Sequence, residues 1–344
     1  DIMPTNADGT MGFKQNSDLF YLSGIDQEET VLLVFPDHPD PKFREILFVR
    51  ETNENIAIWE GEKLTKQTAF ETSGIQTVYW LQQFPTIFKQ LMAEAQGIYL
   101  NTNEHLRANT EVETREDRFI KQVKQDYPAH QVYKSAPIMH KIRSIKEQLE
   151  LDLMQTACNI TEAGVRRLLG FIKPGVWEYE IEAELAHEFL RKRSKGFAYT
   201  PIVASGKNAC VLHYRADVAP VRDGDLVLID AGCELDGYAS DITRTFPANG
   251  KFTGPQRDLY NLVLASQDAA VSATKAGARF NDPHDATVKV LAQGLLDLGV
   301  LNKDKRGNVQ DVIEKRAYFQ FYMHRTGHWL GMDVHDCGSY VEPT

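Results

Sequence analysis

One segment in the second half of the chain constrains the fold most strongly, because its residues show the pattern of two strands joined by a tight turn. It begins Asp225-Leu-Val-Leu-Ile-Asp-Ala-Gly. The short apolar run predicts a strand over Leu226–Ala231. Asp236-Gly237 is a hairpin turn signal, so Tyr238–Phe246 is expected to be the returning strand. This part of the chain should therefore fold as an antiparallel hairpin.

Two carboxylates fall on these strands, where an isolated charge is unfavourable. Asp230 lies at the end of the apolar strand, and Asp241 lies on its partner. Because burying even a neutral polar group without a partner costs about 2–7 kcal/mol, we expect a positive group beside them. Arg244 could pair with one aspartate while the other stabilises a turn. A divalent metal ion could bind both, since paired carboxylates suit hard or borderline cations. The segment alone leaves both interpretations open.

A histidine-rich segment near the end of the chain is the second candidate for chemistry. It contains His324, His328 and His335 within twelve residues. Residues four apart share a face on a helix and also on a strand, so the spacing does not decide between them. Gly327 and Gly331 favour a strand or a loop. Clustered histidines often line a pocket, where imidazole serves as ligand, acid or hydrogen-bond donor, although each could also be a structural residue.

His213 is a third candidate, within Cys210-Val-Leu-His-Tyr-Arg215. The stretch is apolar and strand-like. On these residues alone, a histidine packed in the core is the favoured interpretation.

The remaining pattern predicts two domains. Residues 1–140 alternate short apolar runs with helical patterns, which is typical of an α/β domain whose sheet is covered by helices. Residues 141–344 predict an α+β domain with helices packed on a mostly antiparallel sheet. The boundary is expected near Ser135–Ser144, where Pro137 should interrupt any helix. The expected helices are 82–95, 113–126, 146–169, 178–194, 255–276 and 282–299, and the expected strands outside the hairpin are 31–35, 46–49 and 97–100.

Composition excludes several classes of protein. Acidic residues outnumber basic ones 48 to 38, and the net charge of −10 argues against broad binding to nucleic acid or anionic membranes. No apolar run approaches the roughly 18 residues of a membrane helix. The four cysteines include no C-x-x-C pair, as is typical of reduced thiols. We therefore expect a cytoplasmic protein with no nucleic-acid partner and no membrane partner.

Together, these motifs resemble those of the metallopeptidases with the pita-bread fold, and most closely aminopeptidase P (Xaa-Pro aminopeptidase) and prolidase. The resemblance is carried by Asp230-Ala-Gly, Ser240-Asp-Ile-Thr-Arg-Thr245 and His324-x-x-x-His-Trp-Leu-Gly-x-Asp-Val-His335. Phe13–Gly24 is similar to the segment that opens the sheet of the creatinase-like N-terminal domain. Ile145–Leu151 is similar to the helix that enters the catalytic domain. The resemblance implies an α/β N-terminal domain followed by an α+β pita-bread catalytic domain.

The resemblance also implies a site for two divalent metal ions, usually manganese, with zinc or cobalt as alternatives. Asp230 resembles a ligand of one metal, Asp241 a bridging carboxylate, and His328 the single nitrogen ligand. The implied reaction is hydrolysis of the bond between an N-terminal residue and a following proline, by a hydroxide that bridges the two metals. The implied partners are peptides with proline at the second position.

Three histidines resemble catalytic residues of the family. His213 and His335 are similar to residues that hydrogen-bond the substrate and the tetrahedral intermediate, and His324 is similar to a further pocket histidine. Selectivity for proline is physically reasonable, because an Xaa-Pro amide has no N–H and bends the chain. Trp59 and Tyr214 are candidates for apolar walls, with plain core packing at least as compatible.

The sequence departs from the family in one respect. The other two metal ligands of the family are glutamates, and too few residues follow His335 to contain them. Glu342 sits too close to His335 to be assigned. We therefore expect the two glutamates beyond residue 344, with the catalytic domain incomplete at its C-terminal end and the N-terminal domain lacking its first strand.

Rival functions share this fold. Prolidase accepts only dipeptides, and the Gly327-His-Trp-Leu-Gly-Met-Asp pattern favours aminopeptidase P over it. Creatinase is a metal-free amidinohydrolase, and some other relatives are non-catalytic binding proteins; both classes lack the metal carboxylates. An inactive fragment is a further alternative. The presence of Asp230, Asp241 and His328 favours a peptidase. The family also suggests a homodimer or a higher homo-oligomer.

Overall fold

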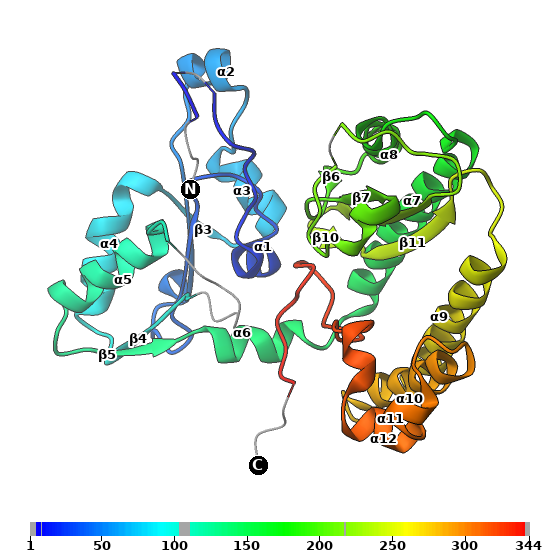
Figure 1. Ribbon diagram of the computed structural model, residues 1–344. Coiled ribbons are helices and arrows are strands. Elements are labelled where there is room, and N and C mark those ends of the chain that lie inside the picture. The colour runs from blue at the N-terminus through cyan, green and yellow to red at the C-terminus, as the bar shows by residue number, and fades with distance from the viewer. Residues whose placement is uncertain (1–4, 8, 103–110, 217, 341–344) are drawn as a thin grey trace. The chain divides into compact units, whose positions relative to one another are not determined.

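A computed structural model describes residues 5–7, 9–102, 111–216 and 218–340 (Figure 1). The chain divides into two compact units, Asp1–Ile145 and Lys146–Thr344. Helix α6 (Ala136–Arg143) occupies the boundary region where we expected no helix, because Pro137 lies in its first turn, where the missing N–H is tolerated. Among the described residues, no helix is both long and apolar enough to cross a membrane.

The first unit is an α/β domain. Its described strands are β1 (Val31–Val34), β2 (Glu45–Val49), β3 (Thr77–Trp80), β4 (Gly97–Leu100) and β5 (Gln131–Lys134). Strand β2 pairs antiparallel with β1 and parallel with β3, and β4 pairs parallel with β5. Ile46 and Phe48 pack into one buried cluster, and Leu47 and Val49 pack into another. Because β2 is covered on both faces, its sequence is a continuous apolar run.

Short helices flank these strands. The described helices are α1 (Ser17–Ser23), α2 (Glu54–Glu60), α3 (Lys66–Ser73), α4 (Phe84–Met92), α5 (Arg115–Asp126) and α6, with 3₁₀ turns η1 (Pro41–Phe43) and η2 (Leu81–Gln83). The single helix expected over 82–95 is instead η2 followed by α4. Pro85 stands in the first turn of α4 and favours the start of the helix there.

The second unit combines helices with antiparallel sheets. Its described helices are α7 (Gln148–Phe171), α8 (Glu178–Arg191), α9 (Gly254–Ala273), α10 (Asp282–Asp297), α11 (Lys303–Arg306) and α12 (Val309–Glu314), with 3₁₀ turns η3 (Gly206–Cys210) and η4 (Ala317–Gln320). Helix α7 packs on β9 and β10, helix α8 packs on β7, and α9 lies along α10 (Figure 1). This agrees with the expected α+β class.

The strands of the second unit form two sheets within its described residues, in the orders β11-β8-β7 and β10-β9-β6. These strands are β6 (Gly196–Phe197), β7 (Ile202–Ser205), β8 (Leu226–Ala231), β9 (Cys233–Leu235), β10 (Tyr238–Ala239) and β11 (Ile242–Pro247). All the pairings in both sheets are antiparallel.

The predicted hairpin is present, but the single returning strand expected over Tyr238–Phe246 is wrong. That stretch forms β10 and β11, which belong to different sheets. The turn itself is as expected, since Asp236 and Gly237 both have positive φ, at 48° and 85°, as a type I′ hairpin requires.

A close approach of two backbones accompanies this change of sheet. A Cβ atom on Gly232 would lie 1.6 Å from the carbonyl oxygen of Ser240. The Ser240 N–H donates to the Cys233 carbonyl at 3.0 Å, and the Ser240 hydroxyl lies 2.8 Å from the Thr161 hydroxyl of α7. The chain therefore leaves β8 at Gly232 and returns through Ser240-Asp241, with α7 bracing the crossing.

Candidate metal centre

Asp230 lies in β8, the middle strand of the β11-β8-β7 sheet. Successive side chains of a strand point to opposite faces. Val227, Ile229 and Ala231 are buried in the core that α7 and α8 cover. Asp230 is half-buried and therefore lies on the opposite face of the sheet.

Asp241 occupies the break between β10 and β11. The pairing of β11 with β8 begins at Ile242, opposite Ala231, so Asp241 stands at the end of the sheet that carries Asp230. The alternative of an ion pair with Arg244 is not what forms, since that side chain is exposed and its guanidinium donates to the Thr243 carbonyl.

Tyr199 joins the two carboxylates and was missed by the sequence reasoning. Its hydroxyl lies 2.5 Å from Asp230 Oδ1 and 3.0 Å from Asp241 Oδ1. A phenol has one hydrogen to donate, so it cannot fully satisfy two anions. Tyr199 lies just before β7, whose Ile202 pairs with Asp230. This cross-strand pairing is not visible in the sequence, so no sequence signal pointed to Tyr199.

His328 approaches Asp241 from the histidine-rich segment, which forms no helix or strand in its described part. Its Nε2 lies 3.2 Å from Asp241 Oδ2, and its Nδ1 lies 2.7 Å from the Trp329 carbonyl oxygen. A carbonyl only accepts, so Nδ1 must carry a hydrogen. In the neutral ring the Nε2 lone pair then faces a carboxylate, and either a proton or a metal ion is needed there. An Nδ1–H held by a carbonyl is the usual support of a metal-binding histidine.

The electrostatics of the two aspartates differ. Burial raises the pKa of Asp230, and the neighbouring Asp241 charge adds to the increase. The hydrogen bond with His328 lowers the pKa of Asp241. Burial and the two carboxylates together raise the pKa of Tyr199, which therefore stays a neutral donor. Negative charge concentrated in this way favours a bound cation.

The donor set fits a divalent metal in its chemistry, although the shell is not closed. Two carboxylates and one imidazole are ligands that zinc and manganese accept. Among the described residues, no group of three or more His, Cys, Asp or Glu side chains is arranged to enclose an ion. The three side chains are instead linked in series. Tyr199 joins Asp230 to Asp241, and a direct contact joins Asp241 to His328.

The other predicted histidines lie in exposed positions. His335 stacks edge-on against His328, with ring centroids 4.3 Å apart. His324 directs its Nδ1 to the Arg325 carbonyl, and it lies near enough to Asp230 to affect that carboxyl electrostatically. The structure thus brings His335 against the aspartate–histidine contact, and no described contact brings His213 there.

His213 differs from the expected strand-like core histidine. It lies in an exposed turn after η3. The neighbouring Tyr214, offered above as an apolar wall, donates its hydroxyl to Glu178 Oε2 at 2.7 Å. Glu178 is fully buried, and its Oε1 also accepts from Ser205 and Asn208. The turn is therefore held by a polar network, which apolar periodicity does not reveal.

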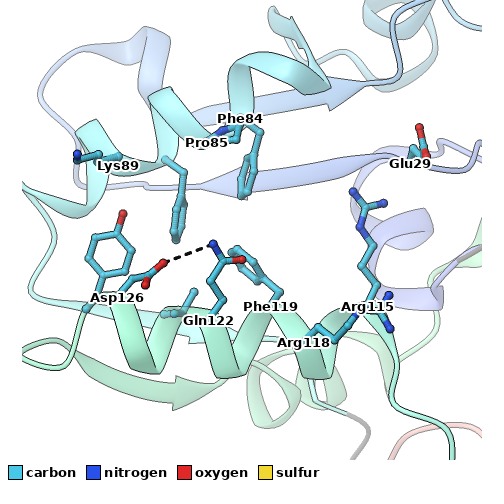
Figure 2. A pocket seen from close by; sticks show the side chains of 12 residues that line it. Glu29, Phe84, Pro85, Lys89, Arg115, Arg118, Phe119, Gln122 and Asp126 are labelled. Atoms are coloured by element: carbon cyan, nitrogen blue, oxygen red, sulfur yellow. Dashed lines mark hydrogen bonds between the residues drawn. The ribbon is translucent and has the colours of Figure 1, made fainter.

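The first unit contains a cavity that involves none of the predicted site residues. It has a volume of about 690 Å³ and lies between α4 and α5 (Figure 2). The apolar side chains of Phe84, Phe88 and Phe119 line it, as do the charged side chains of Arg115 and Arg118. Trp59, the other proposed wall, is 88% exposed on α2 and is not packed in a core.

Tyr199→Phe provides a test of the contacts around the two carboxylates. In the presence of a chelator, we expect it to lower the free energy of unfolding by about 1–3 kcal/mol at pH 7, because both carboxylates lose their shared donor. Urea denaturation measures this. Tyr260→Phe is the control, since the Tyr260 ring lies tilted against Phe252 without a described hydrogen bond, and this substitution should change stability by less than about 0.5 kcal/mol. Equal losses in the two variants would contradict the assignment.

Comparison with known proteins gives two family matches. Residues 152–344 match the model of metallopeptidase family M24, and residues 1–99 match that of the aminopeptidase P N-terminal domain. The chain is 38% identical to the Xaa-Pro aminopeptidase of Haemophilus influenzae over 335 residues, covering 97% of this chain and 74% of that one. It is 35% identical to the Xaa-Pro aminopeptidase of Escherichia coli over 336 residues, covering 97% of this chain and 75% of the relative.

Solved structures agree in fold. The Pseudomonas aeruginosa aminopeptidase PepP superimposes with a TM-score of 0.88 at 36% identity, covering 99% of this chain and 76% of that one. A zinc-substituted Escherichia coli aminopeptidase P in complex with product gives a TM-score of 0.87 at 33% identity, with 99% and 76% coverage. These similarities extend over both units.

Proposed function

The chain belongs to metallopeptidase family M24, in the group with an aminopeptidase P N-terminal domain, and we propose that it removes the N-terminal residue from peptides whose second residue is proline. The observation that carries this proposal is the contact of Asp241 with His328 and, through Tyr199, with Asp230. Two relatives that each match 97% of the chain are Xaa-Pro aminopeptidases.

We propose that Asp230, Asp241 and His328 would hold the metal, and the family resemblance implies that Asp241 would be shared if two ions bind. Manganese is the expected metal, and zinc or cobalt are alternatives; the zinc-substituted relative supports a divalent ion. When bound, such ions would lower the pKa of a metal-bound water molecule and polarise the carbonyl of the scissile peptide bond. The two glutamate ligands implied by the resemblance are assigned to no described residue.

The chain's own residues would then act on the peptide. The imidazole of His335 is exposed beside His328, where it can donate a hydrogen bond to the oxygen of the reacting carbonyl. We assign the same kind of role to His213, whose turn is fixed through Tyr214 and Glu178. His324 is proposed to line the pocket. Donors that are already oriented stabilise the developing charge of the tetrahedral intermediate without further reorganisation.

Peptide cleavage tests this proposal. With manganese added, an Xaa-Pro-Xaa tripeptide should release its first residue, and an Xaa-Ala-Xaa control should react at least about tenfold more slowly. Chromatography of the released amino acid is the measurement. Cleavage of an Xaa-Pro dipeptide but of no tripeptide would indicate prolidase instead. Metal binding without any cleavage would indicate a non-catalytic binding protein or an inactive fragment.

Two further expectations stay predictions. The family suggests a homodimer or a higher homo-oligomer, which light scattering on the purified protein would determine. The cytoplasmic location expected from the cysteine pattern of the sequence also stays a prediction.

A further inference from the structure

A buried ion pair connects the start of α7 to the histidine-rich segment. Lys146 Nζ lies 2.6 Å from Asp336 Oδ2, and the side chains are 10% and 1% exposed. Lys146 stands just before α7, and Asp336 follows His335 directly, so the pair joins residues 190 positions apart. Burying two charges is costly unless they stay in close contact. The pair should therefore hold the two segments of the chain together in this part of the fold.

Asp336 is linked to His328 through one backbone carbonyl. The Asp336 N–H donates to the Trp329 oxygen at 3.1 Å. The same oxygen accepts from His328 Nδ1 at 2.7 Å. The carbonyl that sets the tautomer and orientation of His328 is therefore held by the residue that Lys146 anchors.

The packing around the pair leaves little room for movement. A Cβ atom on Gly331 would lie 2.2 Å from Asp336 Oδ2 and 2.9 Å from Lys146 Cε. The Gly331 carbonyl also accepts a hydrogen bond at 2.9 Å from the N–H of Ala239. Ala239 lies two residues before Asp241. The segment that carries His328 is thus pinned both to α7 and to the hairpin that carries Asp241.

A second contact from α7 fixes the same hairpin. Tyr238 in β10 donates its hydroxyl to Glu150 Oε1 at 2.9 Å, and both side chains are buried. The first turn of α7 and Lys146 just before it therefore contact the two segments that meet at the Asp241–His328 contact.

We propose that the buried Lys146–Asp336 pair is a positioning device that directs His328 toward Asp241. This inference rests on the proposed metal site and goes beyond it, because neither residue is a ligand. Partners that orient a metal-binding histidine through its second nitrogen typically affect metal affinity 10- to 100-fold. Here the orienting group is a backbone carbonyl, and the ion pair keeps it in place.

The test compares Lys146→Met, Asp336→Asn and Lys315→Met in the full chain. Lys315 forms an exposed ion pair with Asp311, so the same substitution there removes a charge pair without touching the site. Competition with a chromophoric chelator measures the affinity for Co²⁺. We expect Lys146→Met and Asp336→Asn, the two site variants, to bind Co²⁺ about 10- to 100-fold more weakly than the parent. Lys315→Met should bind like the parent. Lys146→Arg, which keeps the positive charge, should bind more tightly than Lys146→Met.

Amide hydrogen exchange without metal separates positioning from general stability. The Asp336 and Ala239 amides should exchange at least tenfold faster in the site variants, while those of β8 keep their protection. Uniformly faster exchange would overturn the proposal. Asp336→Asn is close to the parent in shape, so it keeps the test open if Lys146→Met does not fold.

Asp241→Ala separates a failure of the positioning role from a failure of the proposed metal site. If it abolishes Co²⁺ binding while Lys146→Met and Asp336→Asn bind like the parent, only the positioning role is wrong. If Asp241→Ala itself binds Co²⁺ like the parent, the proposed metal site is wrong.

Discussion

Asp241→Ala is expected to abolish both metal binding and peptidase activity. Asp241 contacts Tyr199 through one carboxylate oxygen and His328 through the other, so it links the two remaining ligands. Its removal takes away the carboxylate that faces His328 Nε2 and leaves Asp230 as the only carboxylate of this group. We expect metal affinity to fall by more than about 100-fold, beyond the effect of losing an orienting partner alone.

Metal content after dialysis and cleavage of the Xaa-Pro-Xaa tripeptide measure this effect. Asp258→Ala is the matched control, because Asp258 is exposed on α9 and makes no described contact. The fold should persist in both variants, since Asp241 is only half-buried, and circular dichroism would verify this. Unchanged metal content in Asp241→Ala would refute the shared-ligand assignment.

The sequence predicts the hairpin well because its signals are local. The apolar run of β8 and the Asp236-Gly237 turn depend on neighbouring residues, and both form as expected. The break between β10 and β11 depends on Gly232 meeting Ser240 across the hairpin. Period-two alternation carries no information on such a contact, so the returning strand was expected to be continuous.

Sequence motifs mark only part of the candidate site. Asp230, Asp241 and His328 belong to recognisable motifs, and the structure brings them into one chain of contacts. Tyr199 and Glu178 belong to no such motif, and their contacts depend on how β7 and η3 pack. The prediction for His213 was wrong for a different reason. The apolar stretch around it suggested a strand, but the stretch forms a turn that the buried carboxylate of Glu178 holds through Tyr214.

Gly232→Ala is expected to be among the most destabilising single substitutions in the chain. The new Cβ would lie 1.6 Å from the Ser240 carbonyl oxygen and 3.0 Å from the Asp241 nitrogen. Both atoms are backbone, so no side-chain rotation relieves the overlap. Gly232 does not have positive φ, and the cost therefore arises from the contact rather than from the conformation of alanine. We expect a loss of about 4 kcal/mol or more in the free energy of unfolding, which is exceptional for one substitution.

Urea denaturation of Gly232→Ala and Gly170→Ala makes the comparison direct. Gly170 is exposed in α7, with no atom within 4 Å of an added Cβ, so alanine should raise stability there by up to about 1 kcal/mol through helix propensity. Relief of the overlap at Gly232 would push Ser240 away and move Asp241, which follows it. Metal affinity should therefore fall even where the variant stays folded. A Gly232→Ala protein with parental stability and parental metal affinity would show that the two backbones are not in contact, and the account of how the chain places Asp241 would be wrong.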